Sequence, residues 1–291
     1  MLATPFDFPY EEQSCRGKSP DPSLVCTLTG SSPPRAILFP GMPLTMDCTP
    51  LGGCSDQPGP LGGPLLPKSK IEALLWDNDG VLVDTEPLYL QANREILGGI
   101  GIELTENLYK EISLRQGRSV FELAADRGVD AAQIERLKVD RNARYTELID
   151  EGVEVLGGVR EALERFLGHL PMGIVTSSQR EHFDRIHQKT GLLGYFDFVL
   201  ASGDYVRHKP HPEPYLAGAA RHGYPPERCL AIEDTERGLA AAVAADMPCM
   251  VIPRPLSQAG NFASALHVLE SAAELPRRVG SLLEVRVESC Q

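Results

Sequence analysis

The 291-residue chain lacks the long apolar runs of a membrane protein and the basic excess of a nucleic-acid-binding protein. Its longest apolar candidate, residues 238–253, is interrupted by Asp246 and is too short to span a bilayer. The 28 lysines and arginines are outnumbered by 40 aspartates and glutamates, which gives a net charge of −12. A nucleic-acid backbone or an anionic membrane surface attracts positive protein surface. We therefore expect neither nucleic acid nor membrane as a partner.

The sequence also lacks the cysteine patterns of zinc sites and of disulfide frameworks. Its seven cysteines are scattered, with no CxxC and no histidine at zinc-finger spacing. Such cysteines are typical of free thiols in a reducing compartment. The first residues include Asp7, Glu11 and Glu12 and have no basic region before an apolar core, unlike a secretory signal. These features predict a cytoplasmic protein.

Proline is plentiful but unevenly placed. The first 70 residues hold 13 of the 24 prolines and no apolar positions at a helical or strand period. Paired prolines and glycines there prevent regular structure, and little apolar area is present to offset chain entropy. We predict that residues 1–70 are a disordered Pro/Gly-rich extension with no folded role. A targeting tail and a partner-binding tail are the alternatives.

From Ile71 onward, short apolar runs alternate with longer amphipathic stretches. The five runs are residues 71–76, 172–176, 196–201, 229–232 and 249–252. Short unbroken apolar runs separated by helical spans are typical of a parallel sheet that helices cover on both faces. The predicted fold is therefore α/β, with a doubly wound, Rossmann-like parallel sheet.

About 95 residues separate the first two runs, and their apolar positions follow helical spacing. This pattern predicts an inserted α-helical cap domain of about four helices, residues 87–155. The catalytic core then comprises residues 71–86 and 156–291. Gly157 and Gly158 at the return to the core permit a hinge, and hinged caps close over ligands.

Pairs of carboxylates follow two of the predicted strands. Asp77 and Asp79 follow the first run, and Glu233 and Asp234 follow the fourth. Because carboxyl ends of parallel strands meet at the ligand-binding edge of such a sheet, we expect the four side chains to lie together. Crowded carboxylates need a cation or a proton, and oxygen ligands suit Mg²⁺ holding a substrate phosphate. Taken alone, the Asp77 and Asp79 pair is more often a solvated acidic turn.

The end of the second run offers groups for a phosphate. Thr176 and Ser177 carry hydroxyls, and Ser178 with Glu181 fits a capping box that would start a helix running to Lys189. Free amides at such a helix start bind phosphate, although a capped helix alone is also a complete explanation.

Lys209 precedes Pro210 in an extended segment. Its ammonium could neutralise a phosphate or separate acidic groups, and an ordinary surface lysine is the alternative.

Taken in order, these segments resemble the four motifs of the haloacid dehalogenase superfamily, in the branch of β-phosphoglucomutases and phosphoglycolate phosphatases. The segments are DNDGVLVDTE at 77–86, IVTSS at 174–178, KPHPEPY at 209–215 and EDTERGLAAA at 233–242. The resemblance covers about residues 72–252. It implies a phosphohydrolase with a helical cap that acts on a small phosphorylated metabolite, such as a sugar phosphate or phosphoglycolate.

The resemblance also implies a role for each residue. Asp77 would be the nucleophile that becomes an aspartyl phosphate. Asp79 would protonate the leaving alcohol and then activate water, in an environment that raises its pKa above that of Asp77. Mg²⁺ would be held by Asp77, the Asp79 carbonyl and Asp234, with Glu233 as a direct or indirect contributor. Asp84 would fix the loop. The phosphoryl oxygens would be bound by Thr176, Ser177 and Lys209.

Three alternatives and one specificity hypothesis remain. A dehalogenase needs no leaving-group acid, so Asp79 argues against that activity. The β-phosphoglucomutases carry a histidine where this chain has Tyr89, which favours a phosphatase over a mutase. A non-catalytic binding or regulatory protein would lack a nucleophile or a metal ligand, and none is missing. Arg118 is expected to contact a distal anionic group of the substrate, and the protein is expected to be monomeric.

Overall fold

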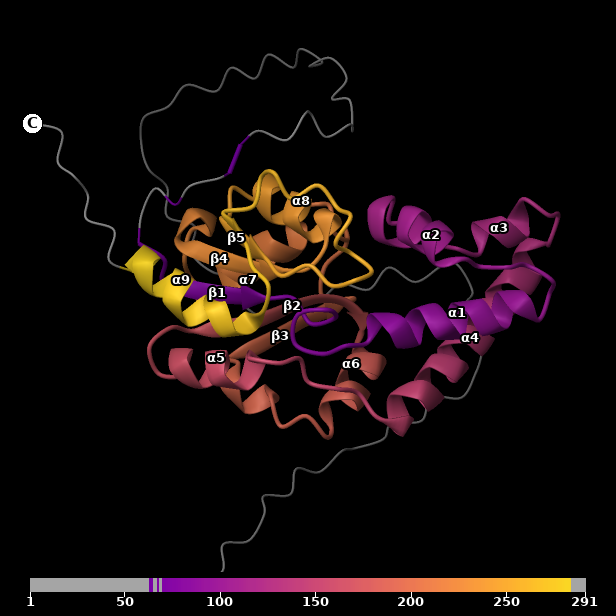
Figure 1. Ribbon diagram of the computed structural model, residues 1–291, viewed down its shortest axis with the longest axis horizontal. Helices are drawn as coiled ribbons and strands as arrows, with labels where there is room; N and C mark the ends of the chain where they lie inside the picture. The colour runs from indigo at the N-terminus through magenta and orange to yellow at the C-terminus, as the bar shows by residue number, and fades with distance from the viewer. Residues whose placement is uncertain (1–62, 65–66, 68–69, 284–291) are drawn as a thin grey trace, which may run out of the picture. The chain divides into compact units, whose positions relative to one another are not determined.

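The computed structural model describes residues 63–64, 67 and 70–283. The predicted extension, residues 1–70, therefore lies almost entirely outside the described residues. The described chain forms a six-stranded sheet in the order β3-β2-β1-β4-β5-β6, with every neighbouring pair parallel (Figure 1). Helices cover both of its faces, which confirms the doubly wound α/β fold.

All five predicted strands are present with shifted ends. The strands are β1 (Ala73–Trp76), β2 (Met172–Gln179), β3 (Phe198–Ser202), β4 (Cys229–Glu233), β5 (Cys249–Val251) and β6 (His267–Val268). The sequence pattern missed β6, because two residues are too few to show a period. This strand pairs with β5 at the edge of the sheet.

The two faces of the sheet carry separate hydrophobic cores because side chains alternate along each strand. Leu74 and Trp76 pack with the helices of one face, and Ala73 and Leu75 pack with those of the other. The first face is covered by α5 (Val159–Phe166), α6 (Arg180–His187) and α9 (Leu275–Leu283). The second is covered by α7 (Glu213–His222) and α8 (Glu236–Ala244). Short 3₁₀ turns lie at Leu193–Tyr195, Pro226–Arg228 and Ala272–Glu274.

The chain between β1 and β2 is helical, and we refer to residues 86–151 as the helical insertion. Its elements are α1 (Glu86–Gly98), α2 (Glu106–Tyr109), a π-helical turn (Lys110–Arg115), α3 (Glu122–Ala125) and α4 (Ala131–Glu151). Leu97, Leu104, Tyr109 and Phe121 belong to a hydrophobic cluster separate from those of the sheet. This cluster gives the insertion its own packing, although its behaviour as a cap domain stays a prediction.

The return from the insertion to the sheet passes through a glycine with a fixed conformation. Gly158 precedes α5 with φ 81°, and a Cβ there would lie 2.5 Å from the backbone nitrogen of Ala273. Both the backbone angle and the close contact require glycine. The predicted hinge motion of Gly157 and Gly158 stays a prediction.

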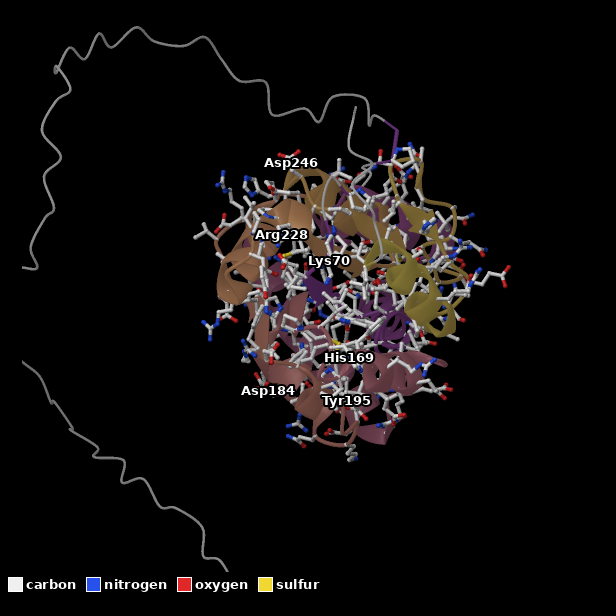
Figure 2. All side chains as sticks on the ribbon, turned by 90° about the vertical axis from the view of Figure 1, so that its left-hand side faces the viewer. Lys70, His169, Asp184, Tyr195, Arg228 and Asp246 are labelled. Atoms are coloured by element: carbon white, nitrogen blue, oxygen red, sulfur yellow. The ribbon has the colours of Figure 1, made fainter. Side chains whose placement is uncertain are left out.

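The amino-terminal edge of the sheet faces the viewer in Figure 2. Five labelled residues, each a few positions before a strand, lie there: Lys70, His169, Tyr195, Arg228 and Asp246. The predicted site residues instead follow strands, so they belong to the opposite edge.

Two exclusions from the sequence can be compared with the described residues. Cys229 and Cys249 are buried free thiols, and the other five cysteines lie outside the described part. No described helix combines the length and the apolar character needed to cross a bilayer.

Candidate active site

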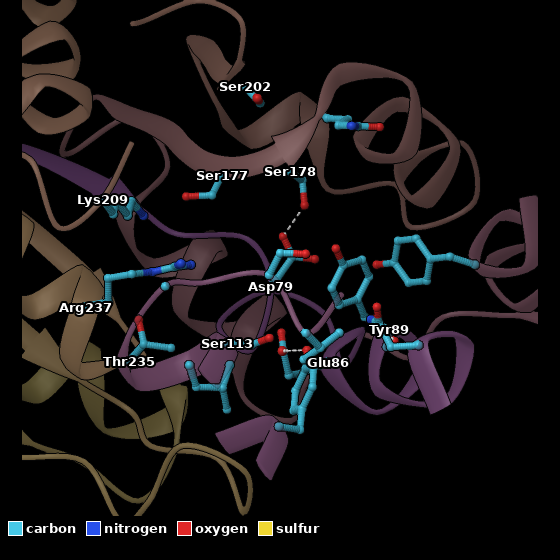
Figure 3. Close-up of a pocket in the computed structure, with 18 of the residues that line it drawn as sticks. Asp79, Glu86, Tyr89, Ser113, Ser177, Ser178, Ser202, Lys209, Thr235 and Arg237 are labelled. Atoms are coloured by element: carbon cyan, nitrogen blue, oxygen red, sulfur yellow. Dashed lines mark hydrogen bonds between the residues drawn. The ribbon is translucent and has the colours of Figure 1, made fainter. Parts of the chain in front are cut away.

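The carboxyl-terminal ends of β1, β2 and β4 border a cavity of about 420 Å³. Its core wall includes Asp77, Asp79, Ser177, Lys209 and Asp234. Its other wall comes from the helical insertion, so the cavity lies between the end of the sheet and the insertion (Figure 3). This placement agrees with the expectation that ligands bind where parallel strands end.

Lys209 joins the first and fourth motifs at the bottom of the cavity. Its Nζ donates to Asp77 Oδ1 at 3.0 Å and to Glu233 Oε1 at 2.6 Å. It also donates to the Val175 carbonyl at 2.9 Å. The lysine is only 5% exposed, and Glu233 is fully buried. The buried Lys209 ammonium therefore binds one carboxylate from each of the two acidic pairs, and crowded carboxylates need such a positive charge.

Charges and burial shift the pKa values in this cluster. Burial and the Glu233 charge raise the pKa of Asp77 to about 7, although Lys209 acts in the opposite direction. Burial also raises the pKa of Asp234 well above its ordinary value, with help from Glu233 and Asp77. Burial alone would lower the pKa of Lys209, but Asp77 and Glu233 raise it further than burial lowers it. A divalent cation would favour the ionised form of both aspartates.

The donor set fits a hard cation such as Mg²⁺. Oxygens of Asp77, Glu233 and Asp234 lie within 4.8 Å of one another. Asp234 Oδ1 is buried and has no hydrogen-bond partner among the described residues. The Glu233 carboxylate, in contrast, accepts hydrogen bonds from Lys209 and from the Tyr215 hydroxyl at 2.6 Å. Among the described residues, Asp234 thus has an oxygen free for a metal, with Asp77 beside it, and Glu233 is bonded to Lys209.

Two glycines permit the close approach of these groups. A Cβ on Gly80, whose φ is 79°, would lie 2.3 Å from Asp234 Oδ2. A Cβ on Gly238 would lie 2.0 Å from the Glu233 carboxylate. The glycines of the first and fourth motifs therefore make room for the two carboxylates at the end of β4, Glu233 and Asp234.

Asp79 lies among hydroxyl groups. Ser178 Oγ donates to its Oδ2 at 2.5 Å, Thr176 Oγ1 donates at 3.2 Å, and Thr85 donates to Oδ1. These three donors hold the Asp79 carboxylate in place, whereas Asp77 is buried beside Glu233 and bonded to Lys209.

The capping-box prediction for Ser178 is wrong. β2 continues to Gln179, which caps α6 without a side-chain hydrogen bond, and the helix ends at His187 rather than Lys189. The Ser178 hydroxyl is directed to Asp79 instead (Figure 3). Because β2 extends past Thr176, the hydroxyls of Thr176 and Ser178 donate to Asp79 and do not cap α6.

The insertion wall carries Arg118, Tyr89 and Arg141. The Arg118 guanidinium pairs with Glu122 and Gln116 and is exposed, so its role toward a substrate stays a prediction. Arg141 donates to the Tyr89 hydroxyl and lies 4.5 Å from the centre of its ring. Tyr89 is thereby fixed at the position where mutases of the resembled branch carry histidine.

Asp84 lies beside the site without lining the cavity. Its carboxylate is 3.8 Å from Arg254, and its amide donates to the Glu154 carbonyl at 3.0 Å. Both contacts agree with the expected structural role.

Sequence reasoning missed Thr85, Tyr215 and Arg237, which contact or line the site. All three lie inside the four motif segments, so their position in a motif could have identified them as site residues. Arg141 could not be identified in this way, because it lies in no motif and its partner Tyr89 is 52 residues away in the sequence, on another helix.

Asn78 of the first motif takes part in a buried hydrogen-bond network with His187 and Thr190. His187 Nε2 lies 2.7 Å from Asn78 Oδ1, and its Nδ1 lies 2.8 Å from Thr190 Oγ1. Burial lowers the pKa of His187 to about 4, although Asp79 and Asp184 act in the opposite direction. The folded protein therefore keeps this imidazole neutral at pH values where the unfolded chain protonates it.

This network predicts a stability loss in acid. Between pH 6.5 and 4 the unfolded chain binds a proton that folded His187 does not bind, so protonation favours unfolding. We expect the unfolding free energy of the wild type, relative to His187→Gln, to fall by on the order of 3 kcal/mol between pH 7 and pH 4. Urea unfolding of both proteins at several pH values measures it. A difference that is constant with pH would contradict the assignment.

Comparisons with known proteins agree with this geometry. The model of the haloacid dehalogenase-like hydrolases matches residues 71–246. Hexitol phosphatase B of Escherichia coli O157:H7 is 30% identical over 210 residues, 71% of this chain and 95% of that protein. A phosphorylated carbohydrates phosphatase of Thermotoga maritima is 35% identical over 182 residues, 60% of this chain and 82% of that protein.

A solved structure shows the same architecture. The crystal structure of CbbY from Rhodobacter sphaeroides in complex with phosphate superimposes with a TM-score of 0.61 and 25% identity. The match covers 70% of this chain and 96% of that one. The motifs, the fold and these relatives agree, and the chain belongs to the haloacid dehalogenase-like hydrolase family.

Proposed function

We propose that this protein is a Mg²⁺-dependent phosphatase that hydrolyses a phosphorylated sugar or a similarly small organic phosphate through an aspartyl phosphate. One observation carries the proposal. Asp77 lies at the carboxyl end of β1, bonded to buried Lys209, within 4.8 Å of Asp234, whose Oδ1 has no partner among the described residues. A carboxylate nucleophile, a buried ammonium and an unpaired carboxylate oxygen that could bind a metal therefore lie together. This combination suits phosphoryl transfer better than binding without catalysis.

The first step transfers the phosphoryl group to Asp77. A carboxylate oxygen of Asp77 attacks phosphorus, an O–P bond forms, and the bond from phosphorus to the alcohol oxygen breaks. Lys209 stabilises the negative oxygens of the transferring group, and Thr176 and Ser177 supply hydroxyl and amide donors beside them. Asp79, which its three hydroxyl neighbours hold in place, donates the proton that the leaving alcohol requires.

The second step releases phosphate and restores the enzyme. Asp79, now ionised, takes a proton from a water molecule as the water oxygen attacks the phosphorus. The bond between phosphorus and the Asp77 oxygen breaks, inorganic phosphate is released, and Asp77 returns to its carboxylate form. Asp77, the Asp79 carbonyl and Asp234 would hold Mg²⁺, with Glu233 acting through Lys209. When bound, the ion supplies positive charge that lets two carboxylates and a phosphate share one site.

The substrate class follows from the relatives, whose names include hexitol and phosphorylated carbohydrates as the compounds they act on. A cavity of about 420 Å³ accommodates a molecule of that size. The mutase alternative is less favoured because Tyr89 is fixed by Arg141 and offers no imidazole. Conversion of a sugar 1-phosphate to a 6-phosphate without phosphate release would support the mutase.

The proposed function is tested by phosphate release from an aryl phosphate and from a panel of sugar phosphates and phosphoglycolate. We expect release with Mg²⁺ and none after the metal is removed with EDTA, with activity restored by added Mg²⁺. A well-folded protein that hydrolyses no member of the panel would favour the non-catalytic alternative.

The role of Asp234 gives a separate prediction. Asp234→Asn removes one charged ligand, so we expect the Mg²⁺ concentration for half-maximal activity to rise at least about tenfold. A Mg²⁺ titration of phosphate release measures this shift. Asp246→Asn makes the same chemical change at an exposed residue on the opposite edge of the sheet and is expected to leave the titration unchanged. Equal titrations of all three proteins would remove Asp234 from the metal site.

A further inference from the structure

Arg237 lines the cavity, and the proposed mechanism does not use it. It lies in the first turn of α8, two residues after the Thr235 cap, and lines the cavity. Its side chain extends from α8 toward Asp79, between Lys209 and Thr235 (Figure 3). Its Nε is buried and has no hydrogen-bond partner among the described residues.

The other arginines that line the cavity already have partners. Arg118 pairs with Glu122, and Arg141 donates to the Tyr89 hydroxyl and to Asn93 Oδ1. Even the neighbour of Arg237, Glu236, pairs with another residue. Within the described part of the chain, Arg237 is thus the cavity arginine without a hydrogen bond or ion pair. A partly buried guanidinium without an acceptor is unfavourable, and an anion from outside would relieve it.

The Arg237 guanidinium contacts the insertion wall of the cavity. Asp77 already has Lys209 as its cation, at 3.0 Å. The Arg237 guanidinium instead meets the turn of the insertion at Gly117, where a Cβ would lie 3.1 Å from Nη1. Gly117 has φ 66°, so this turn approaches the arginine with its backbone alone. Arg237 therefore lies where the two walls of the cavity meet.

We propose that Arg237 binds a second anionic group of the substrate, a phosphate or a carboxylate, and so selects phosphomonoesters that carry two anionic groups. This inference rests on the proposed phosphatase function and specifies its substrate class. Arginine donates two parallel N–H bonds to phosphate or carboxylate oxygens, which gives direction as well as charge. The proposal assigns to a residue of the fourth motif the contact that was expected of Arg118, whose guanidinium is bonded to Glu122 and Gln116.

The test compares three substrates: a hexose bisphosphate, the matching hexose monophosphate with a neutral far end, and phosphoglycolate. In Arg237→Met we expect kcat/KM to fall about 10- to 100-fold for a substrate with two anionic groups, mainly through a higher KM. The fall for the monophosphate should be less than about threefold. Selective loss for the bisphosphate or for phosphoglycolate identifies which anion the arginine binds. Arg237→Lys, which keeps the charge, should recover part of the loss.

Arg136→Met is the matched control, because Arg136 is exposed on α4 and does not line the cavity. Equal loss for all three substrates, or no selective loss for either doubly anionic one, would overturn the inference.

Binding provides a second measurement that does not require turnover. In an Asp77→Asn background, calorimetry should show weaker binding of the doubly anionic substrate after Arg237→Met, with unchanged binding of the monophosphate. If the wild type hydrolyses no substrate, the proposed function fails while this binding comparison still tests Arg237.

Discussion

Asp77→Asn is expected to lower kcat for phosphate release by at least about 1000-fold, the largest effect of any single change to this protein. The amide has no charged oxygen to attack phosphorus, although it keeps the size of the side chain. Measurements at saturating Mg²⁺ are required, so that weaker metal binding is not mistaken for a lost nucleophile. Substrate carrying labelled phosphate should leave label on wild-type protein and none on the variant.

Asp246→Asn is the control for this substitution. Asp246 is exposed and has φ 56°, a conformation that asparagine adopts readily. It should keep full activity. If Asp77→Asn retains a tenth or more of the wild-type kcat, the aspartyl-phosphate mechanism is contradicted.

Lys209→Met is expected to have the largest effect on stability. The ammonium is 5% exposed and binds Asp77, Glu233 and the Val175 carbonyl. Its removal leaves two buried carboxylates without their cation, which costs about 3–5 kcal/mol of unfolding free energy. Unfolding by urea in metal-free buffer measures the loss.

The pH dependence of this loss has a definite sign. The pKa of Asp77 is raised to about 7 in the folded protein, against 3.8 ordinarily, so protonation stabilises the fold as pH falls below 7. The effect of Lys209→Met should therefore be larger at pH 8 than at pH 5.5. Added Mg²⁺ should restore part of the lost stability, because it supplies positive charge beside the same carboxylates.

Lys189→Met serves as its control, because Lys189 is exposed, lies after the end of α6 and belongs to none of the four motif segments. We expect its unfolding free energy to change by less than about 0.5 kcal/mol. A similar loss in both variants, or a Lys209→Met effect that is equal at the two pH values, would show that Lys209 does not neutralise the cluster.

Two kinds of residue make up the site. Asp77 and Asp234 directly follow β1 and β4, and Lys209 lies buried in the loop between β3 and α7, so the reacting centre belongs to the sheet and its loops. The insertion contributes Tyr89, Arg118 and the turn at Gly117 to the opposite wall. Substitutions in the sheet should therefore affect all substrates, whereas those near the insertion should change which substrates are used.

The sequence by itself determined the parallel sheet, the order of the motifs and the strand ends that carry Asp77 and Asp234. These features are local, because a short apolar run defines a buried strand and the polar residue after it marks the strand's end. The pairing of Lys209 with carboxylates at the ends of two strands could also be predicted, since crowded carboxylates require a cation or a proton.

Only the tertiary structure decided which donor serves which acceptor. Local sequence assigned Ser178 to a helix cap, but the continued strand turns its hydroxyl to Asp79. Packing likewise gave Arg118 a partner in Glu122 and left Arg237 without one, although both arginines have the same chemistry. Strand and helix patterns follow from the chain nearby, whereas hydrogen-bond partners depend on distances between segments that only folding brings together.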